Sequence, residues 1–149
     1  VAYDRRRLDS VASVAVFETH PIGVEVDSVP SFYLTSVFNG MLAAKTHHYP
    51  DVPQAFAAMK AGEVDAVMAM RGEVDWQVHE AHDPQLALAE NAYPNMGKQR
   101  WEIGMAVHES NRQLAYAVEE ALEGLIRDGA VQAIYARYGL QYEVPEMYQ

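Results

Sequence analysis

The stretch that decides the fold is DVPQAFAAMKAGEVDAVMA, residues 51–69. Asp51 can cap the start of a helix, Pro53 suits the first turn, and Gly62 suits the position after the last turn. The next run, VDAVMAM over residues 64–70, is nearly continuous in apolar side chains and predicts a short buried strand. A helix followed at once by a buried strand is typical of an α/β fold. One face of the helix is apolar, with Val52, Phe56 and Met59 at spacings of four and three.

The same alternation extends toward the N-terminus and onward to residue 93. Residues 19–30 contain Pro21, Gly23 and Pro30 and are predicted to form a loop. Alternating strands and helices at this spacing predict a mostly parallel sheet covered by helices on both faces. The hydrophobic patterns predict strands at 10–18, 44–49 and 86–93, and helices at 30–42 and 71–82.

The last third of the chain is predicted to hold one strand and two helices. Residues 100–108, RWEIGMAVH, alternate as a strand does. Residues 109–129 form the most amphipathic helix, with Ser110 as its expected cap, and a short helix follows to Gly139. Because an apolar helix stripe needs a covering surface, we expect this one to pack on the same chain or to form a homodimer.

Composition restricts the possible functions. The 149 residues are 50% hydrophobic and carry a net charge of −10. A nucleic-acid partner is not expected, since the basic residues cluster only at Arg5–Arg7. The absence of cysteine excludes thiolate chemistry. No apolar run approaches the roughly 18 residues of a membrane span. The opening VAYDRRRLDS is not a signal peptide, so an exported protein would be a mature or truncated form.

Two motifs carry a family resemblance. The first is Lys60–Val67, KAGEVDAV, and the second is Asp128-Gly129 followed by the helix that ends at Tyr138-Gly139. The chain resembles the second half of periplasmic solute-binding proteins, of the type that serves ABC transporters for polar amino acids. The resemblance implies a periplasmic-binding-protein type II α/β fold, with one lobe complete and the other only partly present.

The resemblance also implies a domain organisation and a location. Residues 1–9 would be a linker or hinge, residues 10–93 the complete lobe, and residues 94–149 a strand and helices that return to the other, missing lobe. Ligand would lie in the cleft between the lobes. The protein would be exported to the periplasm and would not be an enzyme.

The ligand site implied by the family departs from its pattern here. The receptors end the strand at 64–70 with an aspartate that binds the ligand ammonium, whereas this chain has Met70. They carry a Gly-Thr pair after the first strand, whereas this chain has Glu18-Thr19-His20-Pro21. Glu18 would repel a carboxylate, and proline cannot donate an amide. An ordinary amino acid is therefore not expected as ligand, and the cleft candidates are Glu18, Thr19, His20, Met70 and Arg71.

Other constellations do not predict a metal, a cofactor or a catalytic residue. His79 and His82 stand one residue closer than the zinc-binding His-Glu-x-x-His spacing. His47 and His48 are adjacent and would point to opposite faces of a strand. Three acidic residues could attract a hard cation, but no loop has the alternating ligands of a calcium site. These acidic residues are Glu18, Glu25 and Asp27.

Three functional hypotheses follow from these departures. The first is an accessory protein, because the pattern resembles a subset of the family that helps a quinoprotein methanol dehydrogenase to mature or become active. Its partner would be that dehydrogenase, and an acidic surface suits a basic partner. The alternative is a transporter receptor for a small solute other than an amino acid. The third is an enzyme such as a dehydratase, for which Glu18 or His20 would be the acid or base.

Overall fold

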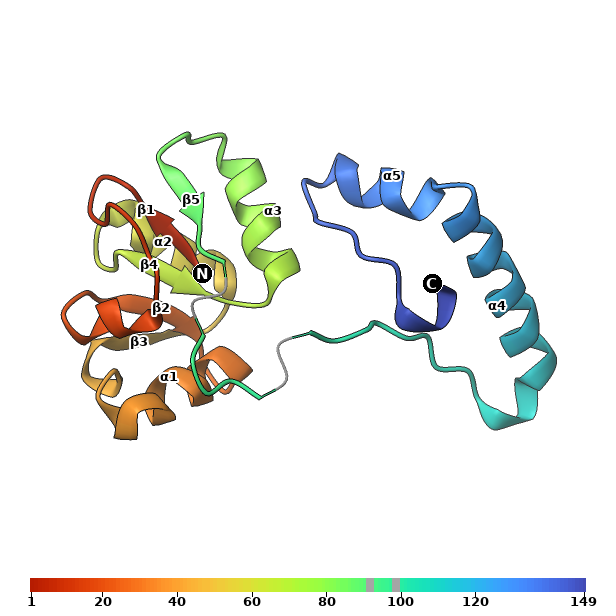
Figure 1. The fold of residues 1–149 in the computed structure, drawn as a ribbon, viewed down its shortest axis with the longest axis horizontal. Helices are drawn as coiled ribbons and strands as arrows, with labels where there is room; N and C mark the ends of the chain where they lie inside the picture. The colour runs from red at the N-terminus through yellow and green to blue at the C-terminus, as the bar shows by residue number, and fades with distance from the viewer. Residues whose placement is uncertain (91–92, 98–99) are drawn as a thin grey trace. The chain divides into compact units, whose positions relative to one another are not determined.

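The computed structural model describes residues 1–90, 93–97 and 100–149. They form two compact units, Val1–Gly97 and Lys98–Gln149. The first unit is built on a five-stranded sheet with the order β3-β2-β4-β1-β5 (Figure 1). The strands are β1 Ala2–Asp4, β2 Ile22–Glu25, β3 Thr46–Tyr49, β4 Ala66–Met68 and β5 Leu86–Leu88.

The sheet is mostly parallel, as the sequence predicts. Strand β2 pairs in parallel with β3 and with β4. Strand β1 lies between β4 and β5 and runs antiparallel to both. We call the edge where β2, β3 and β4 end the carboxyl edge, and the edge where they begin the amino edge.

Three helices cover the two faces of the sheet. They are α1 Val29–Gly40, α2 Val52–Ala61 and α3 Arg71–Ala81. Successive side chains of β4 point to opposite faces of the sheet. Ala66 and Met68 pack in the cluster that contains residues of α1, and Val67 packs in the cluster that contains residues of α2 and α3. The prediction of helices on both faces is confirmed.

The predicted caps of α2 are also confirmed. The Asp51 carboxylate accepts a hydrogen bond of 2.8 Å from the backbone N–H of Gln54. Gly62 ends the helix with φ +87°, and its N–H donates to the carbonyl oxygens of Ala58 and Met59. These local signals explain why the start of β4 could be predicted closely.

The strand predicted at 10–18 is wrong. The segment holds a 3-10 helix, η1 Val14–Glu18, and the Ser13 hydroxyl caps it by accepting from the N–H of Ala15. Apolar residues recur at every third position from Leu8 to Phe17, and the two that lie within η1, Val14 and Phe17, share one side of it. All four are buried: Leu8, Val11, Val14 and Phe17.

The first two strands of the sheet lie instead in the segments that were predicted to be a loop and a linker. Strand β2 occupies 22–25 inside the predicted loop 19–30, and β1 occupies 2–4 inside the segment expected to be a linker. Beyond β5, which ends at Leu88, positions 91–92 of the strand predicted at 86–93 lie outside the described residues. Helix α1 follows its prediction closely, but its last turns depart from helical geometry at 37–39.

The second unit contains α4 Arg112–Arg127 and α5 Ala130–Arg137, joined by Gly129 with φ +74°. The strand predicted at 100–108 does not form, because residues 101–108 pair with no strand in the described part of the chain. Ser110 does not cap α4: it lies in the short helix η3 Glu109–Asn111, and Asn111 precedes α4 without a side-chain bond. No described residue of this unit is buried. In either unit, no described helix is long and apolar enough to cross a membrane.

An ion pair between a buried carboxylate, Asp4, and a half-exposed arginine, Arg6, fixes the end of β1. The Asp4 side chain is 3% exposed and accepts from the Arg6 side chain at 2.7 Å and from the Arg6 N–H at 2.9 Å. The hydrogen bond from the Arg6 side chain lowers the pKa of Asp4 below its ordinary 3.8, although burial opposes the shift. The pair therefore adds stability above the unfolded pKa and loses it as the pH falls through the folded pKa.

We expect Asp4→Asn to flatten the acid limb of the stability curve. Urea unfolding of both proteins between about pH 6 and pH 2 would measure it, and the wild-type free energy of unfolding should fall more steeply. Glu80→Gln, which removes an exposed carboxylate from α3, is the control for loss of one charge. Parallel curves for wild type and Asp4→Asn would contradict the assignment.

Candidate functional site

A pocket of about 250 Å³ lies at the carboxyl edge of the sheet. Its walls come from the loop between β2 and α1, from the loop between β4 and α3, and from the start of α2. We call it the β2–β4 pocket. Its lining residues are 25–30, 68–70, Val52 and Glu73.

The topology of the sheet produces this pocket. Strand β2 continues into α1 on one face of the sheet, whereas β4, which lies beside β2, continues into α3 on the other face. The two outgoing loops therefore diverge and leave a crevice between them. In open α/β sheets, such a switch point at the carboxyl ends of the strands is where ligands bind.

The charged side chains that line the β2–β4 pocket are all acidic: Glu25, Asp27 and Glu73. The Glu73 carboxylate caps α3, because it accepts a hydrogen bond of 3.2 Å from the N–H of Met70. Asp27 is exposed and adopts φ +55°, a left-handed conformation that aspartate tolerates better than most residues do. The pocket therefore presents negative charge.

The start of α1 offers few hydrogen-bond donors to the pocket. The Ser28 hydroxyl donates to the Glu25 carbonyl oxygen at 2.7 Å and accepts from the N–H of Ser31 at 3.2 Å. Pro30 has no N–H, and the N–H of Phe32 donates to the Ser28 carbonyl oxygen. Among the first residues of the helix, only the N–H of Val29 is left to meet an anion.

The structure divides the five residues predicted for the cleft into two groups. Met70 lines the β2–β4 pocket with 40% of its surface exposed, and Arg71 begins α3 beside it. Glu18, Thr19 and His20 lie at the end of η1, before β2, and so at the amino edge. The expectation that these three follow a strand is wrong, and a role for any of the five in binding stays a prediction.

Residues at the amino edge form a structural tie. His20 Nδ1 lies 2.8 Å from the Asp65 carboxylate, and the Arg7 guanidinium lies 3.7 Å from the same group. The Asp65 N–H donates to the Pro21 carbonyl oxygen. Asp65 thus connects the entrances of β2 and β4, and these contacts give it a structural role.

Sequence reasoning missed Ser28 as a pocket residue and considered Glu25 and Asp27 only with Glu18. The signal was present, because Ser-Val-Pro at 28–30 is a good start for a helix. A helix that starts there places the preceding strand at 22–25 rather than at 10–18. The cleft loop then becomes 26–28 instead of 18–21.

The histidine pairs do not assemble a metal centre. The rings of His79 and His82 are 5.9 Å apart and meet edge to face. His48 contacts the Ser31 hydroxyl, and its neighbour His47 is exposed on β3. Within residues 1–90, 93–97 and 100–149, no group of three or more potential metal ligands is found.

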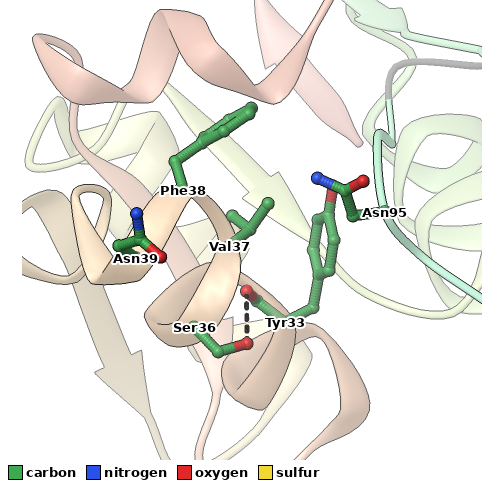
Figure 2. A pocket seen from close by; sticks show the side chains of 6 residues that line it. All are labelled: Tyr33, Ser36, Val37, Phe38, Asn39 and Asn95. Carbon is green, nitrogen blue, oxygen red and sulfur yellow. Dashed lines mark hydrogen bonds between the residues drawn. The ribbon is translucent and has the colours of Figure 1, made fainter.

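A second pocket of about 450 Å³ lies along α1 (Figure 2). The Tyr33 hydroxyl donates to the Pro94 carbonyl oxygen at 2.7 Å, and the Ser36 hydroxyl donates to the Tyr33 carbonyl oxygen at 3.2 Å. No charged side chain lines this pocket. Its lining residues are Tyr33, Ser36, Val37, Phe38, Asn39 and Asn95.

Comparison with known proteins identifies the fold. No protein-family model and no curated protein matches the sequence. An ancestral arginine-binding protein bound to glutamine superposes with a TM-score of 0.60 at 23% identity, over 92% of this chain and 57% of that one. An amino acid ABC transporter substrate-binding protein from Streptococcus pneumoniae, bound to L-arginine, gives 0.60 at 17%, over 96% and 57%. A cysteine-binding protein from Campylobacter jejuni gives 0.57 at 17%, over 99% and 56%.

These neighbours are solute-binding proteins with the periplasmic-binding-protein type II fold, and this chain has the corresponding mixed α/β architecture. The chain spans just over half the length of each of them. At identities below 25%, the similarity shows the fold and leaves the ligand open.

Proposed function

We propose that this chain belongs to a solute-binding protein that holds a small solute in the β2–β4 pocket. The observation that carries the proposal is the place of the pocket, at the switch point between β2 and β4, where an open α/β sheet binds ligands. The neighbours of known structure support it, since their names describe binding proteins for amino acids. The solute would be delivered to an ABC transporter, the kind of partner that the name of the Streptococcus pneumoniae neighbour states, and the protein would act in the periplasm.

The same geometry supports binding rather than catalysis. The acid and base candidates Glu18 and His20 lie at the amino edge, away from the β2–β4 pocket. No histidine lines that pocket, and its carboxylates have no basic partner among the lining residues. General acid–base chemistry needs such groups within reach of one substrate.

A solute other than an ordinary amino acid is supported by Met70 and by the start of α1. Met70 occupies the end of the β4 segment, where an ammonium would need a carboxylate. Most N–H groups at the start of α1 already donate to Ser28, so a ligand carboxylate would find few free donors there.

A second candidate function is that of an accessory protein for a quinoprotein methanol dehydrogenase. Met70 favours it, because a cleft without the usual anchor could have lost its solute altogether. The net charge of −10 suits a basic partner surface. The exposed apolar side chains of α4 and α5, such as Leu114, Leu125 and Ile134, would then serve the partner or a second copy.

Thermal unfolding of the intact protein with a panel of solutes separates the two functions. The panel holds amino acids, alcohols, small acids, amines and quinone cofactor. A binding protein should melt about 5 °C higher or more with one solute at about a hundred times its Kd. Val26→Trp, which fills the pocket, should abolish the shift, and Val144→Trp, in the other unit, should not. No shift, with salt-sensitive binding to the dehydrogenase, would favour the accessory function instead.

A further inference from the structure

We infer that the solute of the β2–β4 pocket is a small organic cation that carries no carboxylate, such as an alkylamine. The inference rests on the proposed function and adds the chemical class of the ligand. It is argued from the charge of the lining, from the hydrogen bonds at the start of α1 and from the apolar walls of the pocket.

The charge of the lining favours a cation. Glu25 and Asp27 both line the pocket, and neither makes an ion pair with another described residue. No lysine, arginine or histidine is among the lining residues. Carboxylates without a cationic partner leave negative potential that a bound ammonium would neutralise, and the net charge of −10 would attract the same ligand from a distance.

The cationic side chain that directly follows the pocket lining in the sequence already has two carboxylate partners. Arg71 follows Met70 directly, yet its guanidinium lies 2.6 Å from the Asp75 carboxylate and 3.3 Å from Glu90. Asp75 is buried, with a side chain that is 3% exposed, so releasing Arg71 would leave a buried carboxylate without this partner. Arg71 is therefore held away from a ligand in the pocket.

A ligand carboxylate would meet a second obstacle at the start of α1. Helix N-termini bind anions through free N–H groups, but here Ser28 accepts from Ser31 and Pro30 has no N–H. The anion would also lie near Asp27, which precedes the helix. The ammonium group of a zwitterion would thus interact favourably with the pocket and its carboxylate unfavourably. A simple amine would make only the favourable interaction.

The remaining walls suit an alkyl group. Met68 and Val52 form buried parts of the lining, 4% and 3% exposed. Val26, Val29 and Met70 are 47%, 50% and 40% exposed at the pocket, so a ligand that covers them would remove apolar surface from water. Methionine side chains adapt to alkyl groups of different shapes.

Four probes with matched four-carbon skeletons test the charge preference on the full chain. They are butylamine, butanol, butyrate and 2-aminobutyrate, which are cationic, neutral, anionic and zwitterionic at neutral pH. Calorimetric titration at about 50 mM salt should show the tightest binding for butylamine. Its affinity should fall several-fold at about 300 mM salt, because exposed charges are screened.

Charge-neutral variants locate the interaction. Asp27→Asn keeps a residue that tolerates positive φ and removes only the charge. Together with Glu25→Gln, it should weaken butylamine binding about tenfold, which corresponds to about 1.4 kcal/mol. Glu80→Gln removes an exposed carboxylate of α3 that does not line the pocket, and it should leave the affinity unchanged.

The outcomes separate the inference from the proposed function. Binding of butanol, butyrate or 2-aminobutyrate in preference to butylamine, with loss of binding in Val26→Trp, would overturn the cation preference and leave solute binding intact. Binding of butylamine that Asp27→Asn and Glu25→Gln do not weaken would also overturn it. Failure of all four probes, with no thermal shift from the wider solute panel, would overturn both.

Discussion

Replacing Phe17 with alanine should lower the free energy of unfolding by about 3–5 kcal/mol, the range typical of a buried phenylalanine. Phe17 is fully buried and packs in the core cluster that also contains Ile22 and Leu34. Its removal would leave a cavity beneath η1 that the short helix could fill only in part. Urea unfolding of the full chain, followed by circular dichroism, would measure the loss.

A matched variant two positions earlier tests the local geometry. In a strand, residue 15 would share a face with residue 17, so Ala15→Glu would place a charge in the core. In η1, Ala15 is exposed, and the substitution should change the free energy of unfolding by no more than about 0.5 kcal/mol. A loss from Ala15→Glu comparable to that from Phe17→Ala would contradict the 3-10 helix.

Gly62→Ala should destabilise the protein by about 2 kcal/mol, through two effects. The backbone at Gly62 has φ +87°, which strains any residue with a Cβ atom. An added Cβ would also clash with the Arg7 guanidinium. Arg7 would have to move, and its hydrogen bond to the Val64 carbonyl oxygen and its ion pair with Asp65 would weaken.

Two further variants separate these effects. Combining Gly62→Ala with Arg7→Ala removes the steric conflict, so the double variant should lose less than the sum of the two single variants. Gly72→Ala is the control, because no atom lies within 4 Å of a Cβ at Gly72 in α3. It should stabilise the protein by up to about 1 kcal/mol. Equal losses from Gly62→Ala and Gly72→Ala would show that the left-handed turn is not required.

The parts of the fold that could be predicted are those with strong local signals. Asp51 and Gly62 bracket α2, and the apolar run after Gly62 identifies β4. Together with β3 and α3, these elements were enough to predict a mostly parallel sheet covered on both faces. Each is determined by caps and periodicity within a short window of sequence.

The first strands were missed because tertiary contacts outweigh local preference there. Pro21 and Gly23 are typical of a loop, yet Gly23 lies in β2 between two parallel neighbours, and a Cβ there would lie 3.0 Å from the Tyr49 ring. The valine-rich run before it has high strand propensity, but its buried positions recur in threes. Because the strand was predicted at 10–18 and not at 22–25, the loop expected to face the cleft was placed at the amino edge and not at the β2–β4 pocket.

The predicted strand at 100–108 failed for a different reason. Trp101, Ile103, Met105 and Val107 alternate as a strand does, but a strand exists only where another strand pairs with it. The described chain provides no such partner for this segment, so periodicity alone could not decide its structure.

The place of β1 between β4 and β5 has a consequence for how the sheet is completed during synthesis. Ala2 pairs with Val67 of β4 and with Leu88 of β5, so β1 must wait for both of these later strands to be synthesised before it can pair. At about 5–20 residues per second, this delay lasts several seconds. During that time β1 has no native neighbour, and the edge of β4 that later pairs with β1 is also unpaired. Unpaired strand edges promote aggregation. A chaperone bound during synthesis would protect the chain through this interval.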